Sequence, residues 1–282
     1  MMVSSQNKKT AFTLLRTAKI EVIPMKGVEA QLLHLPKEAR VSVTCSPSKG
    51  IDATIELTKQ VINYVDASKV SPHISARLVQ SQMHLKSILE QLRAYGIKGL
   101  FIVGGDAQET AGPYTCSYDL VQAIKDLDAS LELGITAYPE GHPLISKDVL
   151  MQDLQRKSTY ASYMATQMCF DAGVIKNWLE QVRQAGVNLP VQIGIPGVMD
   201  LMKLVQISGR IGVGDSLRFL TKHSATVFKL MSGYKPDALI EELSPLMDDS
   251  LYNIDTFHIY TFNQVEKTEA WRKEKVKQSV YS

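Results

Sequence analysis

The amino-acid sequence predicts an α/β fold: a single (β/α)₈ barrel over residues 1–282, with extra helices before its last strand. Eight short apolar runs alternate with helix-patterned segments at intervals of about 20–30 residues. No linker rich in Pro, Gly or Ser divides the chain, and 282 residues can form one barrel-sized domain. A doubly wound open sheet is the alternative, but eight strands in single file favour closure.

The predicted strands are rich in Val, Ile, Tyr, Phe and Thr, the residue types that suit a pleated, enclosed surface. In chain order they are AKIEVIP (18–24), RVSVTC (40–45), VSPHIS (70–75), GLFIVGGD (99–106), LELGITAYP (131–139), YMATQMCFD (163–171), PVQIGIPG (190–197) and FHIYTFN (257–263).

Helix-like patterns lie between most of these strands. The clearest covers 76–96, where Gly96 is the expected C-cap and the apolar residues of one face are Leu78, Met83, Leu85, Ile88, Leu89 and Leu92. Further helices are predicted at 51–65, 118–127, 148–157 and 174–186. The longer interval before the last strand holds two more helical pieces, at 214–231 and 236–247.

Composition narrows the class of protein. The charges nearly balance, with 31 basic and 29 acidic residues, so nucleic acid is not expected as a partner. Three widely spaced cysteines form neither a disulfide framework nor a zinc pattern, and they suit a reducing cytoplasm. The sequence shows neither a signal peptide nor a membrane-spanning run, so we expect a cytoplasmic protein. The sequence leaves open whether the chain forms a homo-oligomer.

Polar residues gather where the predicted strands end. Active sites of such barrels lie at the C-terminal ends of the strands, and Glu140 and His142 directly follow the fifth strand. Other strands carry candidate polar groups at or near their ends: Thr44, His73, Asp106, Gln167 and Tyr260. These strand ends are therefore the predicted site.

Glu21 stands out because it lies within an apolar strand, between Ile20 and Val22. A carboxyl group that faces a barrel interior loses hydration, which raises its pKa and suits it to donate a proton near neutral pH. An ion pair with a lysine such as Lys19, or an outward edge position, would explain the same residue without catalysis.

Gly104, Gly105 and Asp106 would let the backbone approach a flat ligand closely while one carboxylate meets its ring nitrogens. An ordinary strand-to-helix turn is the alternative. Gln167 offers a donor and an acceptor to a heterocycle, although a backbone-satisfied Gln is as common. His73 and His142 lack metal-ligand spacing, so no metal is expected, and dinucleotide, P-loop and hydrolase fingerprints are absent.

Taken together, these segments resemble the methylenetetrahydrofolate reductase family, in its order and at roughly its spacing, from about residue 18 to 265. The most specific matches are AYPEGHP (137–143) and QMCFD (167–171). The others are IEVIP (20–24), SVT (42–44), PHIS (72–75), GGD (104–106), QRK (155–157), PG (196–197) and FHIYTFN (257–263).

The resemblance implies a barrel that holds FAD at the strand C-termini and uses NADH or NADPH to reduce 5,10-methylenetetrahydrofolate to 5-methyltetrahydrofolate. It assigns Glu21 as the general acid that helps to open the five-membered ring, and Asp106 as the carboxylate beside flavin and pterin. Gln167 and Tyr260 fall on substrate-binding positions. The implied cofactor-binding residues are Thr44, His73, Gly105, Asp106, Tyr138, His142, Arg156 and Lys157.

The chain departs from the family pattern at several places, and two of these departures, at Gly104 and Gln264, remove cations. RGD becomes Gly104-Gly105-Asp106, FPPR becomes IPMK (23–26), and Gln264 replaces the arginine that follows the last strand. Lost cations weaken the grip on a diphosphate or on the folate tail. Two alternatives within the fold are therefore a flavin-free reductase and a reductase of another one-carbon carrier. A non-catalytic folate- or flavin-binding barrel is a third, but a mere binder needs no buried acid.

Overall fold

The computed structural model describes residues 11–211 and 233–281. Its strands pair in parallel and in chain order, and β8 closes onto β1, so that Glu21 is level with Ser42 on one side and Tyr260 on the other. The strands are β1 Lys19–Val22, β2 Arg40–Val43, β3 Val70–Ser75, β4 Gly99–Val103, β5 Glu132–Ala137, β6 Tyr163–Thr166, β7 Val191–Pro196 and β8 Ile254–Tyr260. The predicted (β/α)₈ barrel is confirmed.

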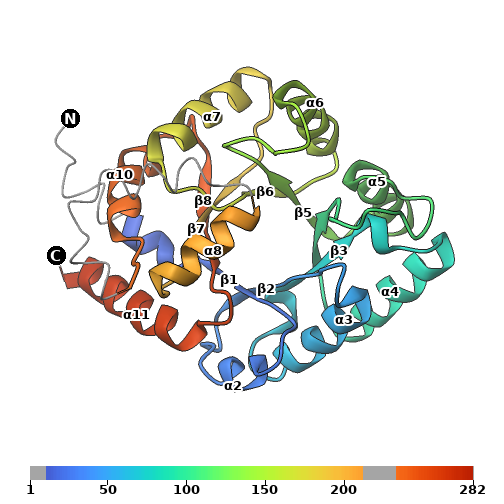
Figure 1. Cartoon of the computed structure of the whole chain (residues 1–282), viewed down its shortest axis with the longest axis horizontal. Coiled ribbons are helices and arrows are strands. Elements are labelled where there is room, and N and C mark those ends of the chain that lie inside the picture. Colours follow the sequence, from blue (N-terminus) through green and yellow to red (C-terminus); the bar gives the residue numbers. More distant parts are fainter. Residues whose placement is uncertain (1–10, 212–232, 282) are drawn as a thin grey trace.

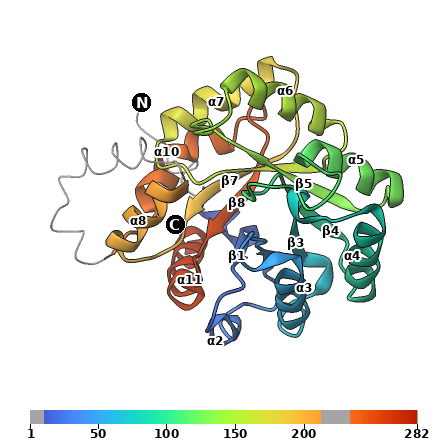
Figure 2. The same ribbon diagram turned by 45° about the vertical axis from the view of Figure 1, so that its right-hand side comes forward.

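Helices surround the strands as an outer ring (Figure 1). The described α-helices are α2 Val28–Leu32, α3 Gly50–Val61, α4 Gln82–Ala94, α5 Ser117–Leu127, α6 Lys147–Ser158, α7 Ala172–Gln184, α8 Leu201–Ile211, α10 Asp237–Met247 and α11 Val265–Tyr281. Helices α8 and α10 lie on the same side of the barrel as α11 (Figure 2). Among the described residues, none of the helices has both the length and the apolar character needed to cross a membrane.

All predicted strands except the third differ from the structure by one to five residues at an end, and two differences among the elements have a clear cause. The last strand begins at Ile254 rather than at 257. The polar residues Asp255 and Thr256 interrupt the apolar run, so its first three residues do not look like a strand in the sequence. The predicted helix over 76–96 is a 3₁₀ turn followed by α4, which Ser81 caps by accepting a hydrogen bond from the backbone N–H of His84 at 3.1 Å. Met83 therefore lies in the first turn and is 81% exposed, not part of the apolar face.

The structure also tests the predicted end of α4 and the two helical pieces that precede the last strand. Gly96 ends the α4 segment with φ at 81°, as a C-cap glycine should. The predicted helix at 236–247 corresponds to α10, whereas the one at 214–231 lies outside the described residues.

The main apolar core lies between the strands and the surrounding helices, and the barrel interior combines polar side chains with a small cluster of Phe101, Tyr163 and Ala165. On β1, Ile20 and Val22 belong to the apolar core, while Lys19 and Glu21 reach polar groups of other strands. Side chains alternate between the two faces of a strand, so this pattern follows from a period of two. The buried polar interior positions the candidate site.

Candidate active site

Glu21 lies inside the barrel and is only 6% exposed. Its Oε2 atom is 3.2 Å from Nε2 of His258 on β8 and 3.9 Å from Nε2 of His73 on β3. Burial raises the pKa of Glu21 to about 7, against a smaller lowering by His73. The carboxyl group is therefore available both as an acid and as a base near neutral pH.

Lys19, two residues before Glu21 in the sequence, does not pair with it. Lys19 Nζ donates to the Tyr163 hydroxyl at 2.6 Å and to Ser71 Oγ at 3.2 Å, towards the strand N-termini. Burial lowers the pKa of Lys19 to about 7. The structure therefore contains no ion pair between Glu21 and Lys19, and Glu21 does not point outward from an edge of the sheet.

Both histidines beside Glu21 are held in the neutral form. Burial lowers the pKa of His73 to about 4 and that of His258 to about 3. His73 Nε2 is 2.7 Å from Ser42 Oγ, and His258 Nδ1 is buried without a partner among the described residues. Each contact between histidine and Glu21 is thus a neutral imidazole beside a carboxyl group, and the exchangeable proton of this cluster belongs to Glu21.

Tyr260 forms one wall beside this cluster. Its hydroxyl donates to the carbonyl of Thr166 on β6 at 2.8 Å, and its ring centroid is 4.9 Å from that of His258. Gly194 makes this possible, because a Cβ there would lie 2.2 Å from the Thr166 carbonyl and 2.8 Å from the Tyr260 ring. Burial raises the pKa of Tyr260 well above its ordinary value, so the phenol stays protonated.

The remaining predicted residues, apart from Arg156 and Lys157 on α6, lie at the C-terminal ends of the strands. Thr44 follows β2, and its hydroxyl is buried without a partner among the described residues. Asp106 is exposed after β4, and its charge adds to burial in raising the pKa of Tyr138. The Tyr138 and His142 rings meet edge to face at 5.5 Å. Gln167 follows β6, and its backbone N–H donates to Ala137 at 2.7 Å.

Gly105 adopts φ of 93°, the left-handed region that favours glycine. A Cβ at this position would lie only 2.0 Å from Ser75 Oγ, so the loop after β4 packs directly against the end of β3. Glycine is therefore required at position 105 both by its backbone conformation and by the lack of space for a side chain. The GGD pattern had predicted only that the backbone comes close to a ligand.

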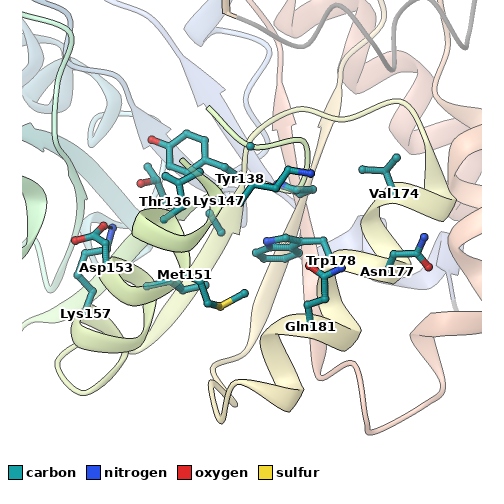
Figure 3. A pocket seen from close by; sticks show the side chains of 15 residues that line it. Thr136, Tyr138, Lys147, Met151, Asp153, Lys157, Val174, Asn177, Trp178 and Gln181 are labelled. Carbon is teal, nitrogen blue, oxygen red and sulfur yellow. Dashed lines mark ion pairs between the residues drawn. The ribbon is translucent and has the colours of Figure 1, made fainter. Parts of the chain in front are cut away.

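A cavity of about 270 Å³ opens between α6, α7 and the end of β5. Trp178 of α7 and Met151 of α6 line it, and Asp153 and Lys157 of α6 border its other end (Figure 3). Lys157 is buried, with Nζ 2.6 Å from Asp153 and 3.2 Å from Ser117 Oγ. Arg156 projects differently: its guanidinium lies 3.9 Å from the centroid of the Tyr118 ring on α5.

These positions test how well FAD fits the residues present. At the flavin end, the unpartnered Thr44 hydroxyl and the Tyr138 phenol leave polar groups for a ring system. At the diphosphate end, Lys157 is already neutralised by Asp153, and the face of Arg156 is covered by Tyr118. Of the two cations that the resemblance assigns to the cofactor, Lys157 is therefore already paired and Arg156 is stacked on an aromatic ring, which is a poor fit to the diphosphate of FAD.

The structure brings part of the predicted set together. Glu21, His73 and, through His258, Tyr260 form one cluster, whereas Arg156 lies at the seam of α5 and α6. Sequence reasoning missed His258, Ser42 and Asp153. The inward alternation of β8 could have indicated His258, and the i,i+4 spacing to Lys157 could have indicated Asp153.

Comparisons with known proteins show which proteins this chain is similar to. The family model described as "Methylenetetrahydrofolate reductase" matches residues 28–274. Methylenetetrahydrofolate reductase 2 of Saccharomyces cerevisiae is 26% identical over 193 residues, 62% of this chain and 31% of that protein. The 5,10-methylenetetrahydrofolate reductase of Buchnera aphidicola (strain APS) is 26% identical over 248 residues, 84% of this chain and 81% of that protein.

The yeast and plant relatives are much longer than the matched part: the alignments span 31% of the yeast protein and 28% of the Arabidopsis thaliana protein. Among solved structures, an uncharacterized Clostridium thermocellum protein described as binding two copies of 5-methyl-5,6,7,8-tetrahydrofolic acid shares the fold. Its TM-score is 0.58 at 15% identity, covering 98% of each chain. Because the family model spans most of the barrel, this chain belongs to the methylenetetrahydrofolate reductase family.

Proposed function

We propose that this chain reduces 5,10-methylenetetrahydrofolate to 5-methyltetrahydrofolate with NADH or NADPH, and that Glu21 is its general acid. The observation that carries the proposal is a carboxyl group in the barrel interior whose pKa is raised to about 7 by burial. Membership of the family supports the substrate. Relatives are named for either nucleotide, NADH in Arabidopsis thaliana and NADPH in Caenorhabditis elegans, so both remain within the proposal.

The chemistry begins with an amine leaving group. Opening the five-membered ring breaks the bond between the bridging methylene carbon and N10 of the folate, and N10 must receive a proton. Protonated Glu21 supplies it and becomes a carboxylate, which later regains a proton from solvent. The neutral imidazoles of His258 and His73 orient the carboxyl group without competing for its proton, because burial holds the pKa of each at about 4 or below.

Ring opening leaves a cationic iminium at N5. Asp106, at the exposed mouth after β4, places a negative charge where it favours that cation. Gln167 provides an amide for the edge of the pterin or the nicotinamide, and Tyr260 forms a fixed wall beside the acid. Hydride then adds to the methylene carbon and yields the N5-methyl product.

The direct test is product formation by the purified full chain. 5,10-Methylenetetrahydrofolate is incubated with NADH or NADPH, each with and without added FAD, and 5-methyltetrahydrofolate is identified by mass spectrometry. We expect the product with at least one nucleotide, with NAD(P)H consumed in equal amount. Absence of the product under all four conditions, in protein with a cooperative melting curve, would contradict the proposed activity.

The cytoplasm is the compartment we propose, because the three free cysteines suit a reducing environment. Fractionation of the source cells, followed by immunodetection, checks this assignment.

A further inference from the structure

The ion pair at the C-terminal end of α6 has a consequence for the cofactor. Lys157 is a buried ammonium group whose side chain is 3% exposed, and its closest partner is the Asp153 carboxylate at 2.6 Å. Ser117 Oγ, at the start of α5, accepts a second hydrogen bond at 3.2 Å. The positive charge of Lys157 is therefore neutralised within the protein, and two of its three N–H donors already have partners there.

The field around this pair is unfavourable for a diphosphate. Burial raises the pKa of Tyr138, and the charges of both Asp106 and Asp153 raise it further, so the end of β5 experiences negative charge from two sides. The diphosphate of a resident FAD adds two more negative charges and normally needs uncompensated cations or N–H donors. Here Gly104 stands in the loop where an arginine would supply one, and Arg156 packs on Tyr118. Lys147, at the start of α6, remains as a further cation that lines the cavity.

We propose that Asp153 withdraws Lys157 from binding the diphosphate of FAD, so that this chain keeps no resident FAD and NAD(P)H, which binds only for the reaction, transfers its hydride directly to the folate. The second half of this statement rests on the proposed function. The step balances: the C4–H bond of the nicotinamide breaks, its electron pair forms the new C–H bond at the methylene carbon, and NAD(P)⁺ is released. The proton on N10 comes from Glu21, so no further oxidant or reductant takes part.

The experiment begins with the wild-type chain. The protein should be colourless after purification, release no flavin on denaturation, and give product from NAD(P)H and methylenetetrahydrofolate at a rate that added FAD leaves unchanged. One equivalent of bound FAD, or turnover that requires FAD, would overturn the proposal. Flavin titration followed by fluorescence decides the cofactor question even if the chain proves inactive on folate, so the two proposals fail separately.

Substitution of Asp153 tests the residue itself. Asp153→Asn removes the charge and keeps the shape, and it should tighten FAD binding by about tenfold or more, the effect of about 1.4 kcal/mol. Asp148→Asn is the matched control, because it removes an exposed carboxylate from the first turn of the same helix and should leave FAD affinity unchanged. Should the Asn variant fail to fold, Asp153→Ser retains a hydroxyl for Lys157. Folded Asp153 variants with no gain over the control would refute the role of Asp153.

Discussion

Replacing Glu21 by Gln should nearly abolish folate reduction, because the variant keeps the shape of the side chain and removes its transferable proton. A general acid contributes about 10²–10⁴-fold to a rate, so kcat should fall by that factor while KM for NAD(P)H changes little. In the wild type, the pKa of Glu21 near 7 predicts that kcat/KM for the folate declines above about pH 7, tenfold per pH unit. The variant should lack this decline.

The same pKa predicts a stability effect of defined sign. The folded-state pKa of Glu21 is raised from 4.5 to about 7, so the folded protein binds this proton more tightly than the unfolded chain. The contribution is fully present below pH 4.5 and is lost as the pH rises to about 7, at a cost of about 3 kcal/mol. Relative to the wild type, Glu21→Gln should therefore gain about that much unfolding free energy across this window.

The assay is nicotinamide oxidation over a range of pH, with urea unfolding of both proteins at each pH. Glu90→Gln, an exposed carboxylate on α4, is the matched control and should alter neither measurement. Wild-type turnover in a folded Glu21→Gln protein would refute the general acid. A stability difference that is flat between pH 4.5 and 7 would refute the buried, desolvated carboxyl group.

Three further predictions concern other residues. Asp106→Asn should lower folate reduction by about 1–3 kcal/mol of transition-state stabilisation, measured as kcat/KM; unchanged kinetics in a folded variant would leave Asp106 as a turn residue. Gly105→Ala should lower the unfolding free energy by about 1–3 kcal/mol, since alanine must adopt φ of 93° and its Cβ would lie 2.0 Å from Ser75 Oγ. A melting temperature equal to wild type would contradict that packing. Lys19 has a folded pKa lowered from 10.5 to about 7, so its unfavourable burial is present below pH 7 and disappears as the pH rises to 10.5. Urea unfolding should show wild-type stability rising across that window relative to Lys19→Met, and parallel curves would argue against a desolvated ammonium group.

The barrel could be predicted from the sequence, because strand and helix periodicities depend on local residue order. The eight apolar runs mark the strands, and β3 has the boundaries that VSPHIS predicts. The sequence also singled out Glu21, since a carboxylate within an apolar strand interrupts the apolar pattern wherever that strand lies in the fold. The location of Thr44 and Asp106 at one face of the barrel could also be predicted, because parallel strands present their C-terminal ends at the same face.

The groups that surround Glu21, and the partners that neutralise the buried lysines, could not be predicted without the folded structure. Closure of the barrel places β8 beside β1, and His258 thereby contacts Glu21 across 237 residues of sequence. Lys19, two residues from Glu21, instead extends to Ser71 and Tyr163. The contacts and desolvation that set the pKa of a carboxyl group, or neutralise a lysine, come from strands and helices distant in sequence, and local residue order does not contain them.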